Sequence, residues 1–420
     1  MPITNPDDDG YLNLSDHDSF VGGIPHNTFS RLRDEDPLSW TEFDGGKGFW
    51  NIVRHADILK WNRNFRVLSS AQGIRMEDQT EEEYLARRTF QEVDPPEHTK
   101  TRVRVGKAFS KPVIANFEAQ IRELCDDILD AALAKSEFDA VAEIARQLPM
   151  RMLGRILDVP DKDLDWLVSK GDELIANSDP DYTDHVIDKS DTDAFRLMPF
   201  RSPAGADLYD YARELIRQKT ESGNDDGVLS LLMQPDAEGN VISETEFRNF
   251  FCLLVAAGND TTRYSIAASL HALATQPRLH AEMTDASAEQ WEKIPDELIR
   301  WASPTFHFRR TATEDFELHG RPVKAGDKVV HWFVSGNRDD QVFDNPFEID
   351  LQRSPNPHVA FGQGGPHVCL GMWLARLEVR VLLQEFVDRV QNIEMNGDHE
   401  CLRSNFVGGI KKLPVRVNLR

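Results

Sequence analysis

Apolar residues recur with helical spacing over most of the chain. Between 247 and 255 they stand at i, i+3, i+4, i+7 and i+8, which predicts one buried face of a helix: Phe247, Phe250, Phe251, Leu254 and Val255. Ser243 and Glu246 stand three apart just before this run and predict a capping box at its start. Leucines and a valine between 370 and 381 form a second stripe. The pattern therefore predicts at least two long amphipathic helices.

A third helix is predicted to begin at Pro295, because proline at the first helical position followed by two acidic residues is typical of a helix start. It should end just before Pro304. Two short runs, 49–53 and 328–334, have the β-branched and aromatic composition of strands. The mixture predicts a mainly α fold, in which a large helical domain carries small antiparallel β-sheets at its edge.

No repeat, low-complexity tract or linker divides the chain. We expect a flexible N-terminal segment over 1–15, which is polar and acidic, and a single domain over 16–420. Periodicity fails between 178 and 205, where six aspartates fall between 179 and 193. A solvated surface loop is the interpretation we favour for this segment, and a lid over a pocket is the alternative.

Charge and composition exclude several classes of protein. The 420 residues include 48 Lys+Arg and 71 Asp+Glu, a net charge of −23, which argues against nucleic acids and anionic membranes as partners. Hydrophobic residues make up 40% of the chain, enough for a sizeable core. The first residues lack the basic start and apolar core of a signal peptide, and no apolar run is long enough to span a bilayer. We therefore expect a cytoplasmic protein.

Cys369 ends a glycine-rich loop, 361–371, directly before a predicted helix. A cysteine at a helix N-terminus lies among free N–H donors, which favours its thiolate, and glycines let a backbone approach a flat ligand. A phosphate-binding loop is excluded because position 367 is His rather than Gly. The alternative is a buried cysteine after a tight turn. The other three cysteines lack this context: Cys125, Cys252 and Cys401.

The first predicted helix carries a polar stretch, 258–262, in its apolar interior. Gly258 lowers helix propensity, and a buried carboxylate such as that of Asp260 is costly. Asp260 beside Thr261, with a turn loosened by glycine, is what proton delivery would need. The alternative is that the stretch faces solvent or a neighbouring helix.

Asp-Pro-Pro at 94–96 starts another predicted helix, which places His98 and Arg102 one turn apart on the same face. Both are hydrogen-bond donors suited to a carboxylate. Five basic residues and no acidic one lie between 100 and 111, which we call the basic patch. A solvated helix face is the alternative for this patch.

These segments, in this order, resemble the bacterial cytochrome P450 superfamily of haem-thiolate monooxygenases. The resemblance rests on Asp-Pro-Pro-x-His-x-x-x-Arg, then Gly-x-Asp-Thr-Thr, then Glu-x-x-Arg, then the cysteine loop. Of four Glu-x-x-Arg copies, only Glu297/Arg300 lies between the Gly-x-Asp-Thr-Thr helix and the cysteine loop. Phe361 stands one residue farther from Cys369 than is usual, which resembles the bacterial subset that oxidises sterols, terpenes and branched lipids.

The resemblance implies haem b (iron protoporphyrin IX) as cofactor, with Cys369 as the axial thiolate ligand of its iron. It implies cofactor contacts, several of them to the haem propionates, from His98, Arg102, Arg310, His367 and Phe361. It implies that Asp260 and Thr261 deliver protons during oxygen cleavage, and that Glu297 and Arg300 are a structural pair.

The implied reaction inserts one atom of O2 into an apolar small molecule, a terpenoid, steroid or lipid-like substrate. Its expected contacts are Leu253, Ala256, Ala257, Phe306 and Phe308. Electrons are expected from a ferredoxin-type donor with its reductase, docking on the basic patch, because the chain has no flavin or nicotinamide fingerprint. Three alternatives stay open: a peroxide-driven haem-thiolate oxidase, a non-catalytic haem-binding protein, and a helical protein without haem.

Overall fold

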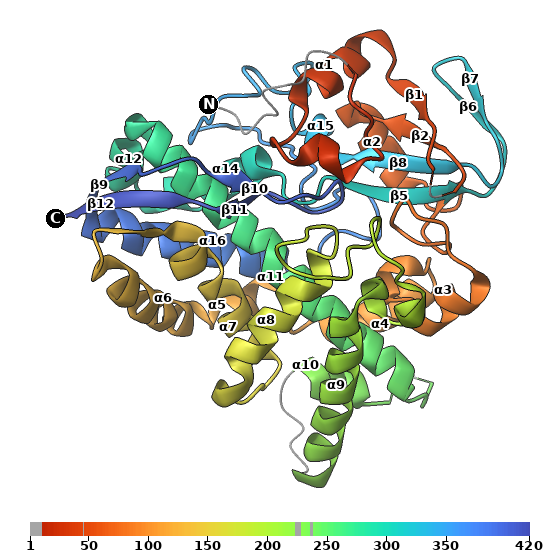
Figure 1. Ribbon diagram of the computed structural model, residues 1–420, viewed down its shortest axis with the longest axis horizontal. Helices are drawn as coiled ribbons and strands as arrows, with labels where there is room; N and C mark the ends of the chain where they lie inside the picture. The colour runs from red at the N-terminus through yellow and green to blue at the C-terminus, as the bar shows by residue number, and fades with distance from the viewer. Residues whose placement is uncertain (1–10, 45, 223–227, 236–237) are drawn as a thin grey trace.

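The computed structural model describes residues 11–44, 46–222, 228–235 and 238–420. One long helix, α11 (Glu244–Thr275), runs through the middle of the molecule, with helices α6 to α10 on one side of it and strands β1, β2, β5 and β8 on the other (Figure 1). Helices predominate and the sheets are small, which confirms the predicted mainly α fold.

The described helices before α11 are α1 (His26–Glu35), α2 (His55–Arg63), α3 (Glu81–Arg87), α4 (Glu97–Gly106), α5 (Lys111–Ala115), α6 (Glu118–Leu133), α7 (Gln147–Ile156), α8 (Leu164–Ile175), α9 (Pro203–Ser222) and α10 (Val228–Met233). Those after it are α12 (Pro277–Thr284), α13 (Ala288–Trp291), α14 (Ile294–Ala302), α15 (Phe333–Gly336) and α16 (Met372–Arg389). None of the described helices has both the length and the apolar character needed to cross a membrane.

The predicted helix starts agree closely with the structure. Ser243 caps α11, because its Oγ accepts a hydrogen bond from the Glu246 N–H at 3.2 Å while the Glu246 carboxylate accepts from the Ser243 N–H at 2.9 Å. α14 ends at Ala302, where Ser303 takes a left-handed φ of 46° before the proline. These ends were predictable because each is determined by residues within four positions along the chain.

The strands are β1 (Leu38–Thr41), β2 (Phe49–Ile52), β3 (Leu68–Ser69), β4 (Glu137–Asp139), β5 (His307–Ala312), β6 (Phe316–Leu318), β7 (Arg321–Val323), β8 (Lys328–Trp332), β9 (Val390–Met395), β10 (Glu400–Cys401), β11 (Ile410–Lys412) and β12 (Pro414–Leu419). They form sheets in the orders β1-β2-β8-β5-β3, β4-β12-β9, β10-β11 and β6-β7. The sheets are antiparallel as predicted except at the β2–β8 pair, which is parallel. These two strands are far apart in the sequence, so no hairpin dictates their direction.

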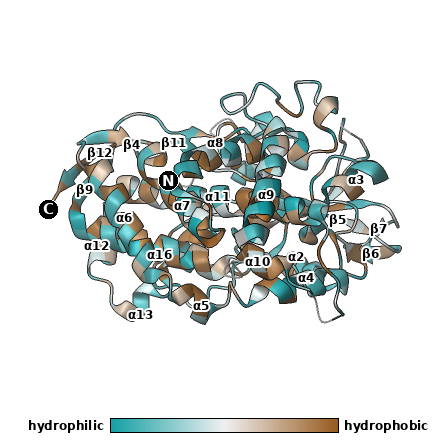
Figure 2. Ribbon diagram, turned by 90° about the horizontal axis from the view of Figure 1, so that it is seen from below, coloured by the Kyte–Doolittle hydropathy of each residue, from teal (hydrophilic) through white to brown (hydrophobic). Residues whose placement is uncertain are grey.

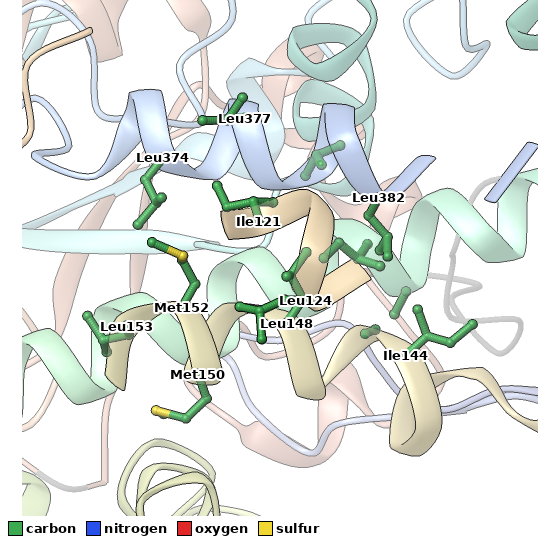
Figure 3. Close-up of a cluster of buried hydrophobic side chains, with 14 of the residues drawn as sticks. Ile121, Leu124, Ile144, Leu148, Met150, Met152, Leu153, Leu374, Leu377 and Leu382 are labelled. Atoms are coloured by element: carbon green, nitrogen blue, oxygen red, sulfur yellow. The ribbon is translucent and has the colours of Figure 1, made fainter. Parts of the chain in front are cut away.

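The largest hydrophobic core lies beneath the start of α16. Figure 3 shows apolar side chains of three helices meeting there: Ile121 and Leu124 from α6, Leu148 and Met152 from α7, and Leu374, Leu377 and Leu382 from α16. Figure 2 shows that α6 and α16 carry hydrophilic as well as hydrophobic residues, as expected of helices with one buried face. Each buried leucine contributes about 1.5–3 kcal/mol, so this core anchors α16 and the loop before it.

Both ends of the described chain meet the segment between α8 and α9. Arg403 donates to the carbonyl of Ser178 and to both carboxylate oxygens of Asp188 at 2.9 and 2.7 Å, and it also pairs with Asp18. Asp179 is buried and accepts from Lys411 at 2.8 Å. The first part of this segment is therefore tied to the body of the protein, although Asp181, Asp184 and Asp188 in it are exposed to solvent as expected of a surface loop.

The expected N-terminal segment, 1–15, falls partly outside the described residues, which begin at 11. Its last residues contact the body of the protein, since Leu14 is buried and the carbonyl of Ser15 accepts from Asn405 Nδ2 at 2.9 Å.

Candidate functional site

A large cavity lies between α11 and the loop 360–371. It encloses about 1520 Å³ of space, part of it open to solvent. Ten of the residues predicted to form the site line this main cavity: His98, Arg102, Leu253, Ala256, Ala257, Thr261, Phe308, Phe361, His367 and Cys369. Predicted site residues from distant segments of the chain therefore meet at one cavity.

Cys369 is the only exposed cysteine of the four, and its exposed surface faces the cavity. Its N–H donates to the carbonyl of Phe361 at 2.9 Å, which closes the loop into a compact turn. α16 begins three residues later, at Met372, so the helix does not start directly at the cysteine. Burial raises the pKa of the Cys369 thiol, whereas the N–H of Gly371 and the charges of Arg102 and Arg376 lower it.

The glycines at 364 and 365 let the loop pack closely against neighbouring backbone rather than against a ligand. A Cβ on Gly365 would lie 2.0 Å from the carbonyl oxygen of Asn62, and one on Gly364 would lie 2.9 Å from that of Leu59. Gln363 accepts from Asn62 Nδ2 at 3.0 Å, so this part of the loop is held against α2. The extra residue of the loop is therefore accommodated on the α2 side.

Unpartnered nitrogen atoms gather at one edge of the cavity. Both ring nitrogens of His98 and Nδ1 of His367 have no hydrogen-bond partner among the described residues, and the two rings lie 4.3 Å apart. Burial lowers the pKa of His98 to about 4, so the ring is neutral and can donate one hydrogen bond. Together with Arg102, these side chains form a donor set suited to an anionic group.

Arg310 was predicted beside this donor set but does not line the cavity. Its Nη1 donates to the carbonyl of Arg309 at 2.8 Å, and the side chain is buried. Burial lowers the pKa of Arg310 to about 10. Burial lowers the pKa of His367, and the positive charge of Arg310 lowers it further, so Arg310 adds positive charge near that ring.

Thr261 lines the cavity, and its Oγ1 donates to the carbonyl of Ala257 at 3.0 Å. α11 is continuous through 258–262, so the predicted loosened turn is absent. Asp260 is fully buried and does not line the cavity. Its Oδ1 lies 2.8 Å from Nη2 of Arg263, but neither carboxylate oxygen has an aligned hydrogen bond among the described residues.

Asp172 of α8 completes a buried charge cluster around this part of α11. Its carboxylate accepts from Asn259 Nδ2 at 2.9 Å, from Arg263 Nη1 at 2.5 Å and from Arg146 Nε at 2.5 Å. Burial is the main cause that raises the pKa of Asp260 to about 8; Arg263 lowers it and Asp172 raises it. Asp260 therefore holds a proton at neutral pH. The sequence signal was the Asp260/Arg263 spacing of three, but nothing local pointed to Asp172.

Phe306 differs from its predicted place. Its ring stacks on Phe20 with centroids 5.5 Å apart, and its N–H donates to the carbonyl of Phe406 at 2.9 Å, so it belongs to the core and not to the cavity wall. β5 begins only at His307, so Phe306 lies outside the strand that carries Phe308. Aromatic residues that sequence reasoning missed line the cavity instead: Phe90, Phe200, Phe333 and Phe406.

The Glu297/Arg300 pair lies in the core behind the site. Arg300 donates from Nε and Nη2 to the two carboxylate oxygens of Glu297, both at 2.8 Å, and also to backbone carbonyls, including that of Asn337. Both side chains are buried and neither lines the cavity. This geometry fits the expected structural role.

The site fits a haem. A cysteine sulfur faces the cavity from one wall, unpartnered donors lie at one edge, and the other walls are largely apolar. A flat macrocycle with an axial thiolate and acidic substituents at one edge requires this combination of groups.

Comparisons with known proteins agree with this geometry. The family model described as Cytochrome P450 matches residues 21–417. A Steroid C26-monooxygenase of Mycolicibacterium smegmatis is 31% identical over 98% of this chain and 94% of its own length. A Methyl-branched lipid omega-hydroxylase of Mycobacterium bovis is 34% identical over 93% of this chain and 91% of its own length. A Mycobacterium marinum cytochrome P450, solved in complex with pseudoionone, superimposes with a TM-score of 0.85 at 34% identity, covering 93% of this chain and 94% of that one.

Proposed function

Because the chain belongs to the cytochrome P450 family and is therefore a monooxygenase, we propose that it hydroxylates a steroid, a terpenoid or a methyl-branched lipid with electrons from a ferredoxin. The observation that carries this proposal is the main cavity, which has the Cys369 sulfur on its wall and Thr261 on α11. The names of the mycobacterial relatives support the lipid-like substrate class.

Haem bound to a cysteine thiolate supplies an electron-rich iron that favours O–O cleavage. Cys369 would be the axial ligand, with its position held by the hydrogen bond to Phe361. His98, Arg102 and His367 would hold the propionates, and Arg310 would add positive charge behind His367.

The substrate would lie against the apolar side of the cavity. Leu253, Ala256 and Ala257 line it from α11, and Phe308 lines it from β5. These side chains offer no hydrogen bonds, so they would hold an apolar molecule by surface burial and exclude water from the reacting carbon.

Asp260 and Thr261 would deliver protons during the reaction. Asp260 holds a proton at neutral pH inside a buried cluster, and the Thr261 hydroxyl faces the cavity. Because Asp260 does not reach the cavity itself, its proton would pass to the Thr261 side of α11 through a water molecule or a side-chain rotation.

An acidic ferredoxin would dock on the basic patch. Lys107 is exposed, and Lys111 lies over the ring of Trp373 with its Nζ 5.1 Å from the centroid. Trp373 stands four residues after Cys369, at the start of α16, so the patch borders the proposed haem ligand. Changing Lys107 to Glu should slow reduction at low salt and have less effect at high salt.

The proposal is tested with the purified, haem-loaded chain. A panel of steroids and methyl-branched lipids is incubated with ferredoxin, ferredoxin reductase and 18O2. The expected result is a hydroxylated product that carries one 18O atom. Product formation with peroxide only, and none with ferredoxin and O2, would instead support a peroxide-driven oxidase.

A further inference from the structure

A second hollow adjoins the main cavity. This side chamber has an empty volume of about 730 Å³. It shares with the main cavity a wall formed by Ile74, Gln91, Phe200, Leu253 and Phe406. Its own lining is unlike that of the main cavity, because it is rich in charged side chains.

Three arginines and two glutamates line the side chamber: Arg75, Arg87, Arg201, Glu77 and Glu92. Two of the arginines have hydrogen-bond partners at ordinary distances. Arg201 Nη1 donates to Glu83 at 2.7 Å, and Arg87 Nη2 donates to Gln79 at 3.2 Å. The third, Arg75, does not.

Arg75 lacks a short hydrogen bond among the described residues. Its Nε and Nη1 have no hydrogen-bond partner there, and its Nη2 reaches Glu77 at 3.5 Å, the outer limit of such a bond. A guanidinium with five N–H donors and one long contact leaves most of its capacity unused. An unpaired polar group inside a protein is costly, so a ligand oxygen that entered the chamber would gain a strong partner.

Aromatic rings hold Arg75 at the shared wall. Its guanidinium carbon lies 5.0 Å from the ring centroid of Phe406 and 5.5 Å from that of Phe200. Both rings also line the main cavity. A molecule whose charged end contacts Arg75 therefore has its apolar body next to the main cavity.

We propose that Arg75 binds the carboxylate of an amphipathic acid, such as a long-chain fatty acid, whose apolar body extends past Phe200 and Phe406 into the main cavity. This inference rests on the proposed function, for which it names the substrate class. Neither Cys369 nor Thr261 is among the residues that line the side chamber. The carboxylate is thus held apart from the reacting atoms, and oxidation falls on carbons remote from it.

Glu77 is the competing partner. Its carboxylate lies 3.4 Å from Nε of Arg75. Burial alone would raise the pKa of Glu77, but Arg75, two nearby histidines and a backbone hydrogen bond lower it to about 2, so it is ionised. An incoming carboxylate shares the guanidinium with Glu77, so removing the Glu77 charge strengthens the binding of the acid.

The test measures binding of dodecanoic acid and methyl dodecanoate to the haem-loaded full chain by titration calorimetry. The two probes share one apolar chain and differ in charge. We expect the wild type to bind the acid about tenfold or more tightly than the ester, and Arg75→Gln to remove this preference without weakening the ester. Arg75→Lys should retain part of the preference, and Glu77→Gln should increase it.

Arg87→Gln is the matched control, because it removes a guanidinium of the same chamber that already has a partner. Its effect on the acid should be smaller than that of Arg75→Gln. Equal binding of acid and ester by the wild type, or equal loss of both in Arg75→Gln, would overturn the inference. Calorimetry is independent of turnover, so an acid preference without oxidation by ferredoxin and O2 would count against the proposed function and not against the site.

Discussion

Arg263 Nη2 lies 2.8 Å from Oδ1 of Asp260, one turn earlier in α11, and both side chains are fully buried. The same guanidinium donates to Asp172 from Nη1 and to the hydroxyl of Tyr264 from Nη2 at 2.7 Å. Asp172 is also contacted by a second guanidinium, that of Arg146. Asp172 thus has the aligned hydrogen bonds, whereas burial raises the pKa of Asp260 to about 8.

The rate of turnover should depend on pH through the protonation of Asp260. The pKa of Asp260 is about 8, so proton delivery should weaken as the pH rises through about 8. Asp172→Asn removes a negative charge that raises this pKa, so the decline should move to lower pH. Initial rates between pH 6 and 9.5 check this, and Asp260→Asn should show no decline in this range. Identical profiles for all three proteins would mean that protons arrive by another route.

The stability of the folded chain should also depend on the protonation of Asp260, and it should fall as the pH rises. The folded-state pKa of Asp260 lies above its unfolded value of 3.8. Between these values the folded chain holds a proton that the unfolded chain has lost, so stability falls as the pH rises through this interval. Thermal unfolding at pH 5 and pH 8 should therefore show a smaller drop in Tm for Asp260→Asn than for the wild type. An equal drop would place the pKa of Asp260 near its ordinary value.

Thr261→Ala should uncouple oxygen use from product formation. The variant keeps the cavity shape but loses the hydroxyl that faces it, so reducing equivalents should appear as peroxide, and product per electron pair should fall about tenfold or more. Peroxide and product are measured together. Thr275→Ala is the control, because Thr275 Oγ1 makes the same type of bond, to His271 O at 2.8 Å, at the far end of α11. Wild-type coupling in Thr261→Ala would remove Thr261 from the proton route.

Cys369→Ser should abolish the thiolate signature of the haem. Cys369 is the only one of the four cysteines that is exposed, and it faces the cavity. The red-shifted band of the ferrous carbonyl complex should disappear in this variant and persist in Cys401→Ser, whose thiol is buried elsewhere. A red-shifted band in Cys369→Ser would assign the iron to another ligand.

Glu297→Gln should destabilise the fold without direct loss of a cavity contact. It leaves the buried Arg300 without its carboxylate, which typically costs about 3–5 kcal/mol of unfolding free energy. Denaturant unfolding measures the loss. Glu214→Gln is the control, since Glu214 forms the same i, i+3 pair with Arg217 on the surface and should change little. Similar losses of unfolding free energy in both variants would show that the buried pair contributes no more to stability than the surface pair.

Sequence reasoning succeeded where neighbours along the chain determine the structure. The capping box at Ser243 and the helix stop before Pro304 depend on residues within one turn. The resemblance to a family extended this to the cavity, because the order of short motifs identifies a fold whose long-range contacts are then implied. Cys369, His98 and Arg102 line one cavity although they come from distant segments.

Sequence reasoning failed where the position or role of a side chain depends on a partner distant in the sequence. Nothing near Asp260 indicates Asp172, which belongs to another helix. Phe306 was expected at the substrate site with Phe308, but its N–H donates to the carbonyl of Phe406 and its ring packs against Phe20 in the core. The sequence around Arg75 did not indicate a binding site, because Arg75 is held by two rings, Phe200 and Phe406, that come from separate parts of the chain.

The contacts of Arg403 also set the order in which segments of the chain reach their final positions during biosynthesis. Arg403 is made 385 residues after Asp18 and 215 residues after Asp188, and it contacts both carboxylates. Neither carboxylate has its Arg403 partner until residue 403 has left the ribosome. The segment between α8 and α9 therefore reaches its final position only late in translation, after the α11 wall of the cavity has emerged. A cofactor that entered during synthesis would meet a cavity in which the wall around Phe200 is not yet fixed.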